Sequence, residues 1–578
     1  MEDALQSVRR RFASLSASVG GRSVCLLTNI FVWLCFFAAA LGLQRYDNAF
    51  SGEFGSYPDE AAHYVTGLMF HDYFASLHFF SPVQFAENFY VHYPKVGIGH
   101  WPPFFYVLQG IWTLIFSTSR TSVMLLMAAL AALFAFVLYL VLKEKLGGTV
   151  SFAAGIVLLA LPAVQAQSAM VMADIPVALF SLLAAMSFGR FLDTERSFDV
   201  LAFGVFSAIA IMTKGSAFAL ALLPLIAIPL SRKWRLFRRL SLWGSAGIVL
   251  AVCGPWYWFT RRMQAGAWNH ANPVMKYSLA AVPFYLWQSV KIMGWGLLIL
   301  GAIGVVIIVR QLLRSPETGK PEENGMWAAM IGLFAGAVTL PCIIPTGLED
   351  RYLLPAVPVA VAFAVAGAKY AVSQVSPRRA QPAATAALLI IVFVATGLSF
   401  PRTRPHGYRT VARTLVSNPR LRHSVILICS DADGEGMLVS EIAMLDYRPD
   451  HVVLRAGEVL ARSDWNGSNY RLLLTSTSQI RAYMDSIPVS AVVIDGSVPN
   501  SSLKAHQTLL QRTVASDAAE WKLLGMYPVW RAGIEHLDSL DVYLFVGHSE
   551  TARGVIHINM KRMLGRTLTL NLANKTQN

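Results

Sequence analysis

The sequence has few charged residues for its length. Only 14% of its 578 residues are charged and 55% are hydrophobic, whereas about 25% of an ordinary soluble protein is charged. This composition excludes a purely soluble protein. Because most of the apolar residues lie in long runs, membrane-spanning helices must be counted before soluble domains.

Cysteine is also scarce, and its distribution excludes two further classes of protein. There are five cysteines and no CxxC pair, so the chain has neither a disulfide framework nor a cysteine-based metal site. Four of them lie in apolar runs and the fifth, Cys429, in a predicted buried strand. Internal repeats and low-complexity tracts are absent as well.

Long apolar stretches predict the membrane part of the chain. Eleven are long enough, at roughly 20 residues each, to cross about 30 Å of hydrocarbon. The first follows four arginines and has no small-residue cleavage site before a soluble chain, so we predict a retained anchor with a cytoplasmic N-terminus. The stretches are 23–44, 121–142, 149–169, 175–192, 198–213, 215–230, 241–260, 292–309, 326–346, 352–370 and 382–400.

The net charge of +14 would indicate nucleic-acid binding in a soluble protein. Here most of the excess lies in residues 1–400, in short loops that the positive-inside rule places in the cytoplasm. Segment 101–118 is apolar enough to be a twelfth span, but a crossing there would move nearly all these basic loops outside. We therefore predict that it is re-entrant or interfacial, broken by Pro102 and Pro103. No nucleic acid is expected as a partner.

This topology divides the chain into a cytoplasmic N-terminus (1–22), a transmembrane domain (23–400) and an extracytoplasmic domain (401–578). The first extracytoplasmic loop covers residues 45–120. Buried strands alternating with helical stretches predict that the last domain is a small α/β domain with a largely parallel sheet. We interpret Asp431-Ala432-Asp433-Gly434-Glu435-Gly436 as a turn, because its carboxylates would repel a phosphate. The predicted strands are 424–430, 451–456, 489–495 and 541–546, and the predicted helices are 435–446, 477–486 and 502–515.

The first outer loop contains Tyr57-Pro58-Asp59-Glu60-Ala61-Ala62-His63-Tyr64. It stands at the start of a predicted amphipathic helix along the membrane, over about residues 60–76. On a helix, Asp59 lies four residues before His63, and Glu60 faces both His63 and Tyr64. Such a group could deprotonate a hydroxyl. The alternative is an ordinary helix start, where acidic residues complement the macrodipole.

Ionisable residues also mark other places on the outer face. Lys95 and His100 precede the double proline and are candidates for a functional role. The alternative is that this segment is an aromatic belt at the membrane interface. Asp174 stands between two spans, either in a functional role or as a helix cap. Lys214 and Arg351 are cations outside the positive-inside pattern and suit a phosphate. Each cation also has an alternative explanation. Lys214 could snorkel from a helix end, and Arg351 could form a local pair with Glu349 or Asp350.

The order of these motifs carries a resemblance. Five motifs follow one another over about residues 23–400: DEAxxY, a PP motif, xxADxP, TKG and RYLLPxxP. The chain resembles the GT-C membrane glycosyltransferases, in the protein O-mannosyltransferase and aminoarabinose transferase branch that uses polyprenyl-phosphate sugars. It departs from the family at His100-Trp101, where a lysine often precedes the prolines.

The resemblance implies roles for these residues. Asp59 is then the general base, while Glu60, His63 and Asp174 form the acceptor site or hold a divalent metal, for which Asp59 and Asp174 are the candidate ligands. Lys214, Arg351 and Tyr352 bind the donor phosphate. The remaining loop candidates are Tyr57, Tyr64, Lys95 and His100.

We therefore expect a multi-pass protein of the bacterial inner membrane with an inverting glycosyltransferase activity. A sugar moves from a polyprenyl-phosphate donor to a hydroxyl or amine on a lipid, glycan or protein acceptor at the extracytoplasmic face. The alternative is a transporter or flippase of a lipid-linked or anionic substrate, because polar residues between spans also mark translocation paths.

Overall fold

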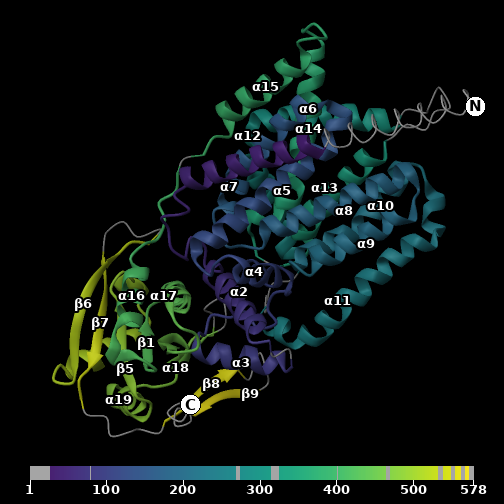
Figure 1. Ribbon diagram of the computed structural model, residues 1–578. Helices are drawn as coiled ribbons and strands as arrows, with labels where there is room; N and C mark the ends of the chain where they lie inside the picture. The colour runs from purple at the N-terminus through teal and green to yellow at the C-terminus, as the bar shows by residue number, and fades with distance from the viewer. Residues whose placement is uncertain are drawn as a thin grey trace, which may run out of the picture.

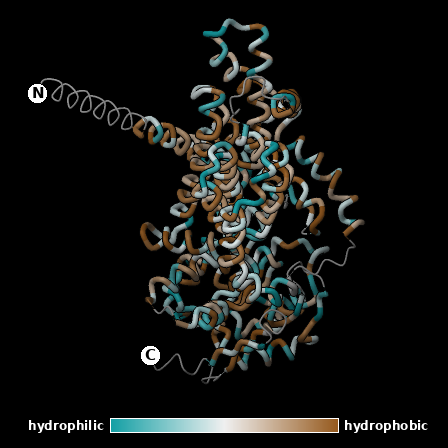
Figure 2. The backbone as a smooth tube through the Cα atoms, turned by 90° about the vertical axis from the view of Figure 1, so that its right-hand side faces the viewer, coloured by the Kyte–Doolittle hydropathy of each residue, from teal (hydrophilic) through white to brown (hydrophobic). Residues whose placement is uncertain are grey.

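The computed structural model shows a bundle of long helices with a smaller α/β domain at one end (Figure 1). It describes residues 26–77, 80–267, 274–313, 324–345, 347–399, 401–463, 469–531, 538–547, 554–560 and 566–571. Hydrophobic segments dominate the bundle, and hydrophilic segments are more frequent in the α/β domain (Figure 2).

Each of the eleven predicted spans coincides with a helix or a pair of consecutive helices. Among the described residues, seven helices are long and apolar enough to cross a membrane, or eight if a pair bent by 67° counts as one span. The others are shorter apolar helices, and the chain is a multi-pass integral membrane protein. The helices of the bundle are Leu26–Tyr46, α5 (Arg120–Leu146), α6 (Gly148–Ala160), α7 (Pro162–Ser168), α8 (Asp174–Thr194), α9 (Ser197–Ile211), η1 (Gly215–Ala221), α10 (Leu222–Leu230), η2 (Trp234–Arg238), α11 (Leu240–Ala267), α12 (Val274–Leu313), α13 (Gly325–Ile343), η3 (Asp350–Ala356), α14 (Val357–Ser373) and α15 (Gln381–Thr396).

The short helix α4 (Phe104–Ile115) occupies the segment whose crossing was in question. Its 12 residues rise about 18 Å, less than the hydrocarbon thickness of about 30 Å. It packs closely on α2 (Glu60–Ala75), where a Cβ atom at Gly110 would lie 3.1 Å from the backbone nitrogen of His71. These dimensions agree with the prediction that 101–118 does not span.

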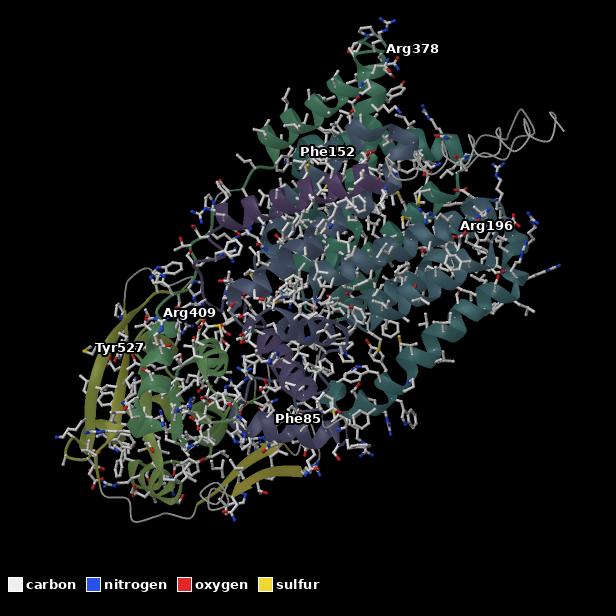
Figure 3. All side chains as sticks on the ribbon, in the orientation of Figure 1. Phe85, Phe152, Arg196, Arg378, Arg409 and Tyr527 are labelled. Atoms are coloured by element: carbon white, nitrogen blue, oxygen red, sulfur yellow. The ribbon has the colours of Figure 1, made fainter. Side chains whose placement is uncertain are left out.

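The basic short loops gather at one end of the bundle. Arg232 donates to the carbonyl of Leu313 at 2.9 Å, and Arg235 and Arg239 pair with Glu195 at 2.5 and 3.1 Å. Figure 3 shows Arg196 and Arg378 towards this end, whereas Arg409 and Tyr527 lie in the α/β domain at the other. The loop charges predict this separation of the basic loops from the α/β domain. That the basic end faces the cytoplasm stays a prediction.

The α/β domain is built on a five-stranded sheet with the order β2-β1-β5-β7-β6. β1 runs parallel to β2 and β5, whereas β7 runs antiparallel to β5 and β6. All four predicted strands are present, and the prediction missed β3, β4, β6, β8 and β9. Two of the four pairings in the main sheet are antiparallel, so the prediction of a largely parallel sheet is wrong. The elements are α16 (Tyr408–Ser417), η4 (Pro419–Leu421), β1 (Val425–Cys429), α17 (Ala432–Leu445), β2 (Val452–Arg455), α18 (Ala456–Val459), β3 (Ala461–Arg462), β4 (Arg471–Leu472), α19 (Thr477–Ser486), β5 (Val489–Asp495), η5 (Asn500–Ser502), α20 (Ala505–Ser516), β6 (Trp521–Val529), β7 (Asp538–Phe545), β8 (Val555–Met560) and β9 (Arg566–Asn571).

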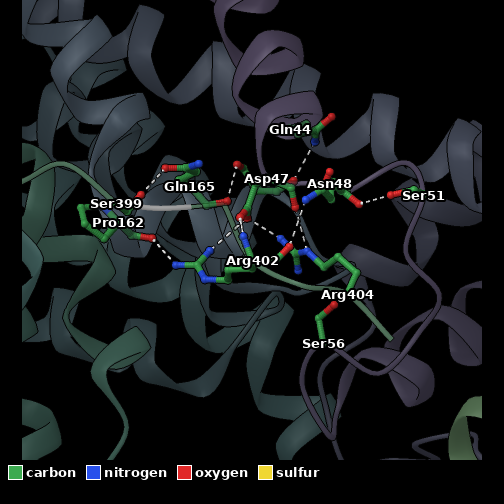
Figure 4. A network of polar contacts seen from close by, with 12 residues as sticks. Gln44, Asp47, Asn48, Ser51, Ser56, Pro162, Gln165, Ser399, Arg402 and Arg404 are labelled. Carbon is green, nitrogen blue, oxygen red and sulfur yellow. Dashed lines mark hydrogen bonds and ion pairs between the residues drawn. The ribbon is translucent and has the colours of Figure 1, made fainter. Parts of the chain in front are cut away.

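Polar contacts join the two parts where the chain passes from α15 to α16 (Figure 4). Asp47, just after the first helix, is fully buried and accepts from both Arg402, at 3.0 Å, and Arg404. Ser399 donates to Gln165 at 2.7 Å. The entry into the α/β domain is therefore fixed to the adjacent end of the bundle by a buried ion pair.

A second connection is formed by the first outer loop, which contains α2 and α3 (Pro82–His92). Arg448 of the α/β domain forms two hydrogen bonds with Asp72 of α2, at 2.8 and 2.9 Å. Arg566 of β9 pairs with Glu87 of α3 at 2.5 Å. The α/β domain therefore packs on the helix at whose start Asp59 stands.

Candidate active site

Asp59 stands at the N-cap of α2, at the end of the bundle next to the α/β domain. Its carboxylate is 16% exposed and lies 3.0 Å from a terminal nitrogen of Arg351. Burial raises the pKa of Asp59, but the charge and hydrogen bond of Arg351, together with the smaller effects of His63 and Lys214, outweigh burial, and the pKa falls below its ordinary value. Asp59 is therefore an ionised carboxylate at neutral pH.

Arg351 links Asp59 to a second carboxylate. It lies in η3, between α13 and α14, and its other terminal nitrogen is 4.0 Å from an oxygen of Asp174. Glu349 lies 3.9 Å from its Nε atom. The guanidinium thus faces three carboxylates, of which Glu349 was the local partner considered from the sequence.

Lys214 completes the arrangement. It precedes η1, and its Nζ atom lies 2.5 Å from Asp174. Asp59, Arg351, Asp174 and Lys214 therefore form a row of alternating charges, here called the charge chain. Four separate segments of the sequence supply it, and all four residues were predicted as site residues.

Two tyrosines cover the cations of the charge chain. The ring of Tyr57 lies 4.2 Å from the Arg351 guanidinium carbon, and its hydroxyl donates to Glu349 at 2.6 Å. The ring of Tyr352 lies 5.1 Å from Nζ of Lys214. Aromatic faces attract cations within about 6 Å, so both predicted tyrosines help to hold these side chains in place.

His63 lies one helical turn after Asp59, but it points into an aromatic cluster. Its Nδ1 atom is 2.6 Å from the hydroxyl of Tyr106, and its ring stacks on Trp101 at 4.3 Å. Burial lowers the pKa of His63 to about 3, against a smaller opposing effect of Asp59. The imidazole is neutral and positioned by Tyr106. Tyr106 was not among the predicted site residues, although it lies three residues after the double proline.

Glu60 does not join the charge chain, contrary to the sequence-based expectation. Its carboxylate is fully buried and accepts from the backbone of Gly55 and Ser56 at 3.1 and 3.0 Å, and it pairs with Arg120 at 3.2 Å. All of these contacts hold the loop in front of α2. Its oxygens are already used, so the prediction that Glu60 binds acceptor or metal is not supported by the geometry.

Tyr64 is also a structural residue. It is fully buried, donates to the carbonyl of Thr118 and stacks on Phe54 at 4.0 Å. This side chain therefore lies inside the first outer loop. Its proximity to His63 in the sequence gave a misleading signal, because neighbouring residues of a helix point in different directions.

Lys95 is buried between the first outer loop and the α/β domain, whereas His100 is buried beside Trp101. Nζ of Lys95 donates to the carbonyl of Ala432 at 3.3 Å, and a Cβ atom at Gly436 would lie 2.5 Å from its Cε atom. Burial and, to a smaller extent, Arg455 lower the pKa of Lys95 to about 8. Burial lowers the pKa of His100 to about 4, against the opposing charge of Asp59. His100 is therefore neutral at neutral pH.

The segment that Lys95 contacts is the start of helix α17, so the predicted turn at 431–436 is wrong. Asp431 is the N-cap residue and accepts from the backbone nitrogen of Gly434 at 2.8 Å. Arg531 pairs with Asp431 at 2.5 Å. The acidic residues that suggested a turn are thus typical of a helix N-terminus, where carboxylates satisfy free backbone N–H groups.

The predicted metal ligands Asp59 and Asp174 both face cations. Arg351 and Lys214 occupy the directions from which a metal ion would be bound, and a cation there would be repelled by both. Among the described residues, the group that could hold a metal is Asp446, Asp450 and His451, in the α/β domain. The arrangement at Asp59 and Asp174 does not fit a metal, and no chemical step below uses one.

Comparisons with known proteins agree with this architecture. The family model for dolichyl-phosphate-mannose-protein mannosyltransferases matches residues 100–259. ArnT from Cupriavidus metallidurans, solved bound to undecaprenyl phosphate, superposes with a TM-score of 0.54 at 14% identity, covering 88% of this chain and 97% of ArnT. The chain therefore shares the fold of ArnT, as the GT-C resemblance implied. The resemblance found in the motifs is thereby confirmed.

More distant similarity extends to another GT-C protein. The Archaeoglobus fulgidus oligosaccharyltransferase in the apo form gives a TM-score of 0.49 at 14% identity, covering 89% of this chain and 76% of that one. The same archaeal enzyme, solved with an inhibitory peptide and a dolichol-phosphate, gives 0.48 at 11% identity, covering 88% and 74%. No curated protein sequence matches the chain.

Proposed function

We propose that this GT-C protein is an inverting glycosyltransferase that takes its sugar from a polyprenyl-phosphate donor. The charge chain carries the proposal. An ionised carboxylate, Asp59, lies 3.0 Å from Arg351, and Lys214 lies close behind it on Asp174. A base beside two cations is the arrangement that transfer from a sugar phosphate requires, because the acceptor loses a proton while the phosphate gains charge.

Arg351 and Lys214 bind the phosphate in this proposal. Without the donor, their charges are balanced by Asp59 and Asp174. A phosphate approaching from the membrane competes with these carboxylates and accepts from the guanidinium, whose planar donors suit phosphate oxygens. The bond between C1 and the phosphate oxygen then breaks with its electron pair stabilised by two cations. The GT-C-like proteins solved with undecaprenyl phosphate and dolichol-phosphate support this donor class.

Asp59 acts as the base. Its carboxylate accepts the proton of the acceptor hydroxyl or amine as the acceptor oxygen or nitrogen attacks C1 from the face opposite the phosphate. That direction of attack inverts the anomeric centre. When Arg351 turns to the phosphate, Asp59 loses part of the charge that lowers its pKa, so donor binding makes it a stronger base.

A largely apolar cavity in the helical bundle supports a lipid donor. It has a volume of about 290 Å³ and lies among α9, η1, α10 and α11. Ile211, three residues before Lys214, lies at its border, and Phe203, Phe218 and Trp243 contribute aromatic walls. An isoprenoid chain fits such walls, since its burial needs no polar partner.

Asp59→Asn tests the base. A general base contributes about 10²- to 10⁴-fold, so we expect a loss of that size in sugar transfer from labelled polyprenyl-phosphate sugars to a cell-envelope fraction. Asp199→Asn is the matched control, because Asp199 lies at the start of α9, at the basic end of the bundle. Near-wild-type transfer by Asp59→Asn contradicts the assignment.

Binding of undecaprenyl phosphate to the protein in nanodiscs distinguishes the base from the phosphate-binding residues. Asp59→Asn should bind it at least as tightly as wild type, because a carboxylate that competes for Arg351 is gone. Arg351→Gln and Lys214→Gln should bind it at least tenfold more weakly. Flux of a lipid-linked substrate without a covalent product would instead favour the transporter.

A further inference from the structure

A group of histidine and aspartate side chains lies in the α/β domain, remote in sequence from the charge chain. Nδ1 of His451 is 2.9 Å from Oδ1 of Asp446 and 3.7 Å from Oδ2 of Asp450. His423 contacts the other oxygen of Asp450. Two imidazoles and two carboxylates thus lie together, and one ligand atom from each of Asp446, Asp450 and His451 fits within 4.8 Å.

Strand pairing fixes this group. β1 and β2 are parallel neighbours with Val425 opposite Val452. His423 and Asp450 stand two residues before these partners, so the sheet brings them side by side. Val452 donates to the carbonyl of Ser424 at 3.0 Å, which extends the pairing towards them. A local sequence motif would not reveal this arrangement, because His423 and Asp450 are 27 residues apart.

The third side of the group is the end of α17. Asp446 is the C-cap residue of this helix, and its Oδ2 atom accepts from the backbone nitrogen of His451 at 3.0 Å and from Tyr93 at 2.5 Å. Both Asp446 and His451 have side chains only 1% exposed. Two ligand candidates are therefore held in place by packing, and Asp450 and His423 close the group on the solvent side.

We propose that His423, Asp446, Asp450 and His451 form a structural Zn²⁺ site. Imidazole nitrogens and carboxylate oxygens are ordinary zinc ligands, with bond lengths of about 2.0–2.2 Å and tetrahedral coordination at structural sites. Tetrahedral bonds of that length separate the ligand atoms by about 3.3–3.5 Å, and the 2.9 and 3.7 Å distances lie on either side of that range. A ligand set that includes imidazole nitrogens favours Zn²⁺ over Mg²⁺ and Ca²⁺, which prefer oxygen ligands.

The site would strengthen the connection between the α/β domain and the membrane part. The loop 446–451 carries Arg448, which holds Asp72 of α2 through two hydrogen bonds, and Tyr93 of the first outer loop reaches Asp446 directly. Zn²⁺ bound to Asp446, Asp450 and His451 would fix the conformation of the loop that carries Arg448. It contacts no residue of the charge chain, so the proposal is independent of the sugar transfer.

Metal analysis of the full-length protein tests the site. We expect one equivalent of zinc per chain after removal of any polyhistidine tag and gel filtration in detergent. Stripping with a chelator should lower the melting temperature, and adding Zn²⁺, but not Mg²⁺, should restore it. Co²⁺ in place of Zn²⁺ should give the visible absorption of a tetrahedral centre, a readout that does not depend on activity.

Three variants sharpen the test. His451→Gln and Asp450→Asn should lose the zinc and the response of the melting temperature to it. His423→Gln removes a ligand whose side chain is 75% exposed, so it should fold normally and bind zinc at least tenfold more weakly. His557→Gln in β8, also exposed, is the matched control and should retain one equivalent, as should Asp59→Asn. A wild-type protein without zinc affinity, or a His423→Gln protein with unchanged affinity, overturns the proposal and leaves a hydrogen-bonded His–Asp network.

Discussion

Arg351 occupies the central position of the charge chain. It is 8% exposed and faces Asp59, Asp174 and Glu349 at 3.0, 4.0 and 3.9 Å. A buried cation with several carboxylate partners influences each of them, because electrostatic interactions are weakly screened away from water. Replacing Arg351 should therefore change the protonation of Asp59 as well as the affinity for phosphate.

The pH dependence of sugar transfer tests this coupling. Burial raises the pKa of Asp59, and Arg351 is the largest of the influences that lower it. In Arg351→Gln the effect of burial remains and that of Arg351 is lost, so the pKa rises. The acidic limb of kcat/KM, where the base becomes protonated, should move to higher pH in the residual activity.

Arg235→Gln is the matched control for this measurement. Arg235 pairs with Glu195 at the basic end of the bundle and its side chain is 71% exposed, so its loss should leave the profile unchanged. An acidic limb at the same pH in Arg351→Gln and wild type would mean that another group titrates. His63 and His100 are poor alternatives, because burial lowers their pKa values to about 3 and about 4.

For individual residues, the sequence predicted which charged side chains belong to the site, but it did not predict which of them pair. Asp174, Lys214 and Arg351 stood out as ionisable residues at the ends of apolar runs, and Asp59 stood out at the start of a predicted helix in the first outer loop. Their pairing depends on contacts between segments far apart, since Asp59 and Arg351 are separated by 292 residues. Helical spacing alone suggested Glu60 as a neighbour of the site, but burial beside Arg120 could be recognised only in three dimensions.

Helices α12 and α14 approach each other through glycines. A Cβ atom at Gly304 would lie 1.9 Å from the carbonyl oxygen of Phe363, and one at Gly367 would lie 1.9 Å from that of Leu300. Small residues allow transmembrane helices to pack with their backbones in close contact. The clash would be with backbone atoms, which cannot move aside as a flexible side chain can.

Gly304→Ala should therefore destabilise the bundle. Overpacking typically costs about 1–3 kcal/mol, and we expect a lower melting temperature in detergent, with the same direction for Gly367→Ala. Gly247→Ala in α11 has nothing within 4 Å of its new Cβ atom and serves as the control. Equal melting temperatures for all three variants would show that α12 and α14 can move apart without loss of stability.

Periodicity and apolar runs predicted whole elements well. Helix α19 has its predicted bounds, 477–486, and the buried strands β1 and β5 were evident as short apolar runs. Strand β6 was missed although most of its residues are apolar, because Gly525 and Pro528 within it are residues that usually interrupt a strand. The start of α17 was mistaken for a turn, since its acidic and glycine residues occur in both.

Across the whole molecule, the buried pair of Asp47 and Arg404 determines how the α/β domain leaves the bundle. Their side chains are 0% and 3% exposed. Removing one partner of a buried ion pair leaves an uncompensated charge and costs about 3–5 kcal/mol. Arg404→Met should therefore lower the melting temperature and expose the 397–407 connection to protease.

Arg402→Met is the control for this prediction, because Arg402 pairs with the same carboxylate but is 37% exposed. Exposed pairs contribute about 0–1 kcal/mol, so its effect should be small. Equal protease sensitivity of the two variants would contradict a special role of the buried pair. The sequence indicated the boundary near residue 400 from its change in composition, whereas the ion pair across it joins positions 357 residues apart.

The shortness of α9 has a consequence for lipids around the protein. Its 15 residues rise about 22 Å, against a hydrocarbon thickness of about 30 Å. Hydrophobic mismatch of this kind is relieved by local thinning of the bilayer. With such thinning, we expect Lys214, three residues after the end of α9, to lie at the depth of lipid headgroups. A lipid phosphate can reach it by lateral diffusion within the leaflet, without leaving the membrane.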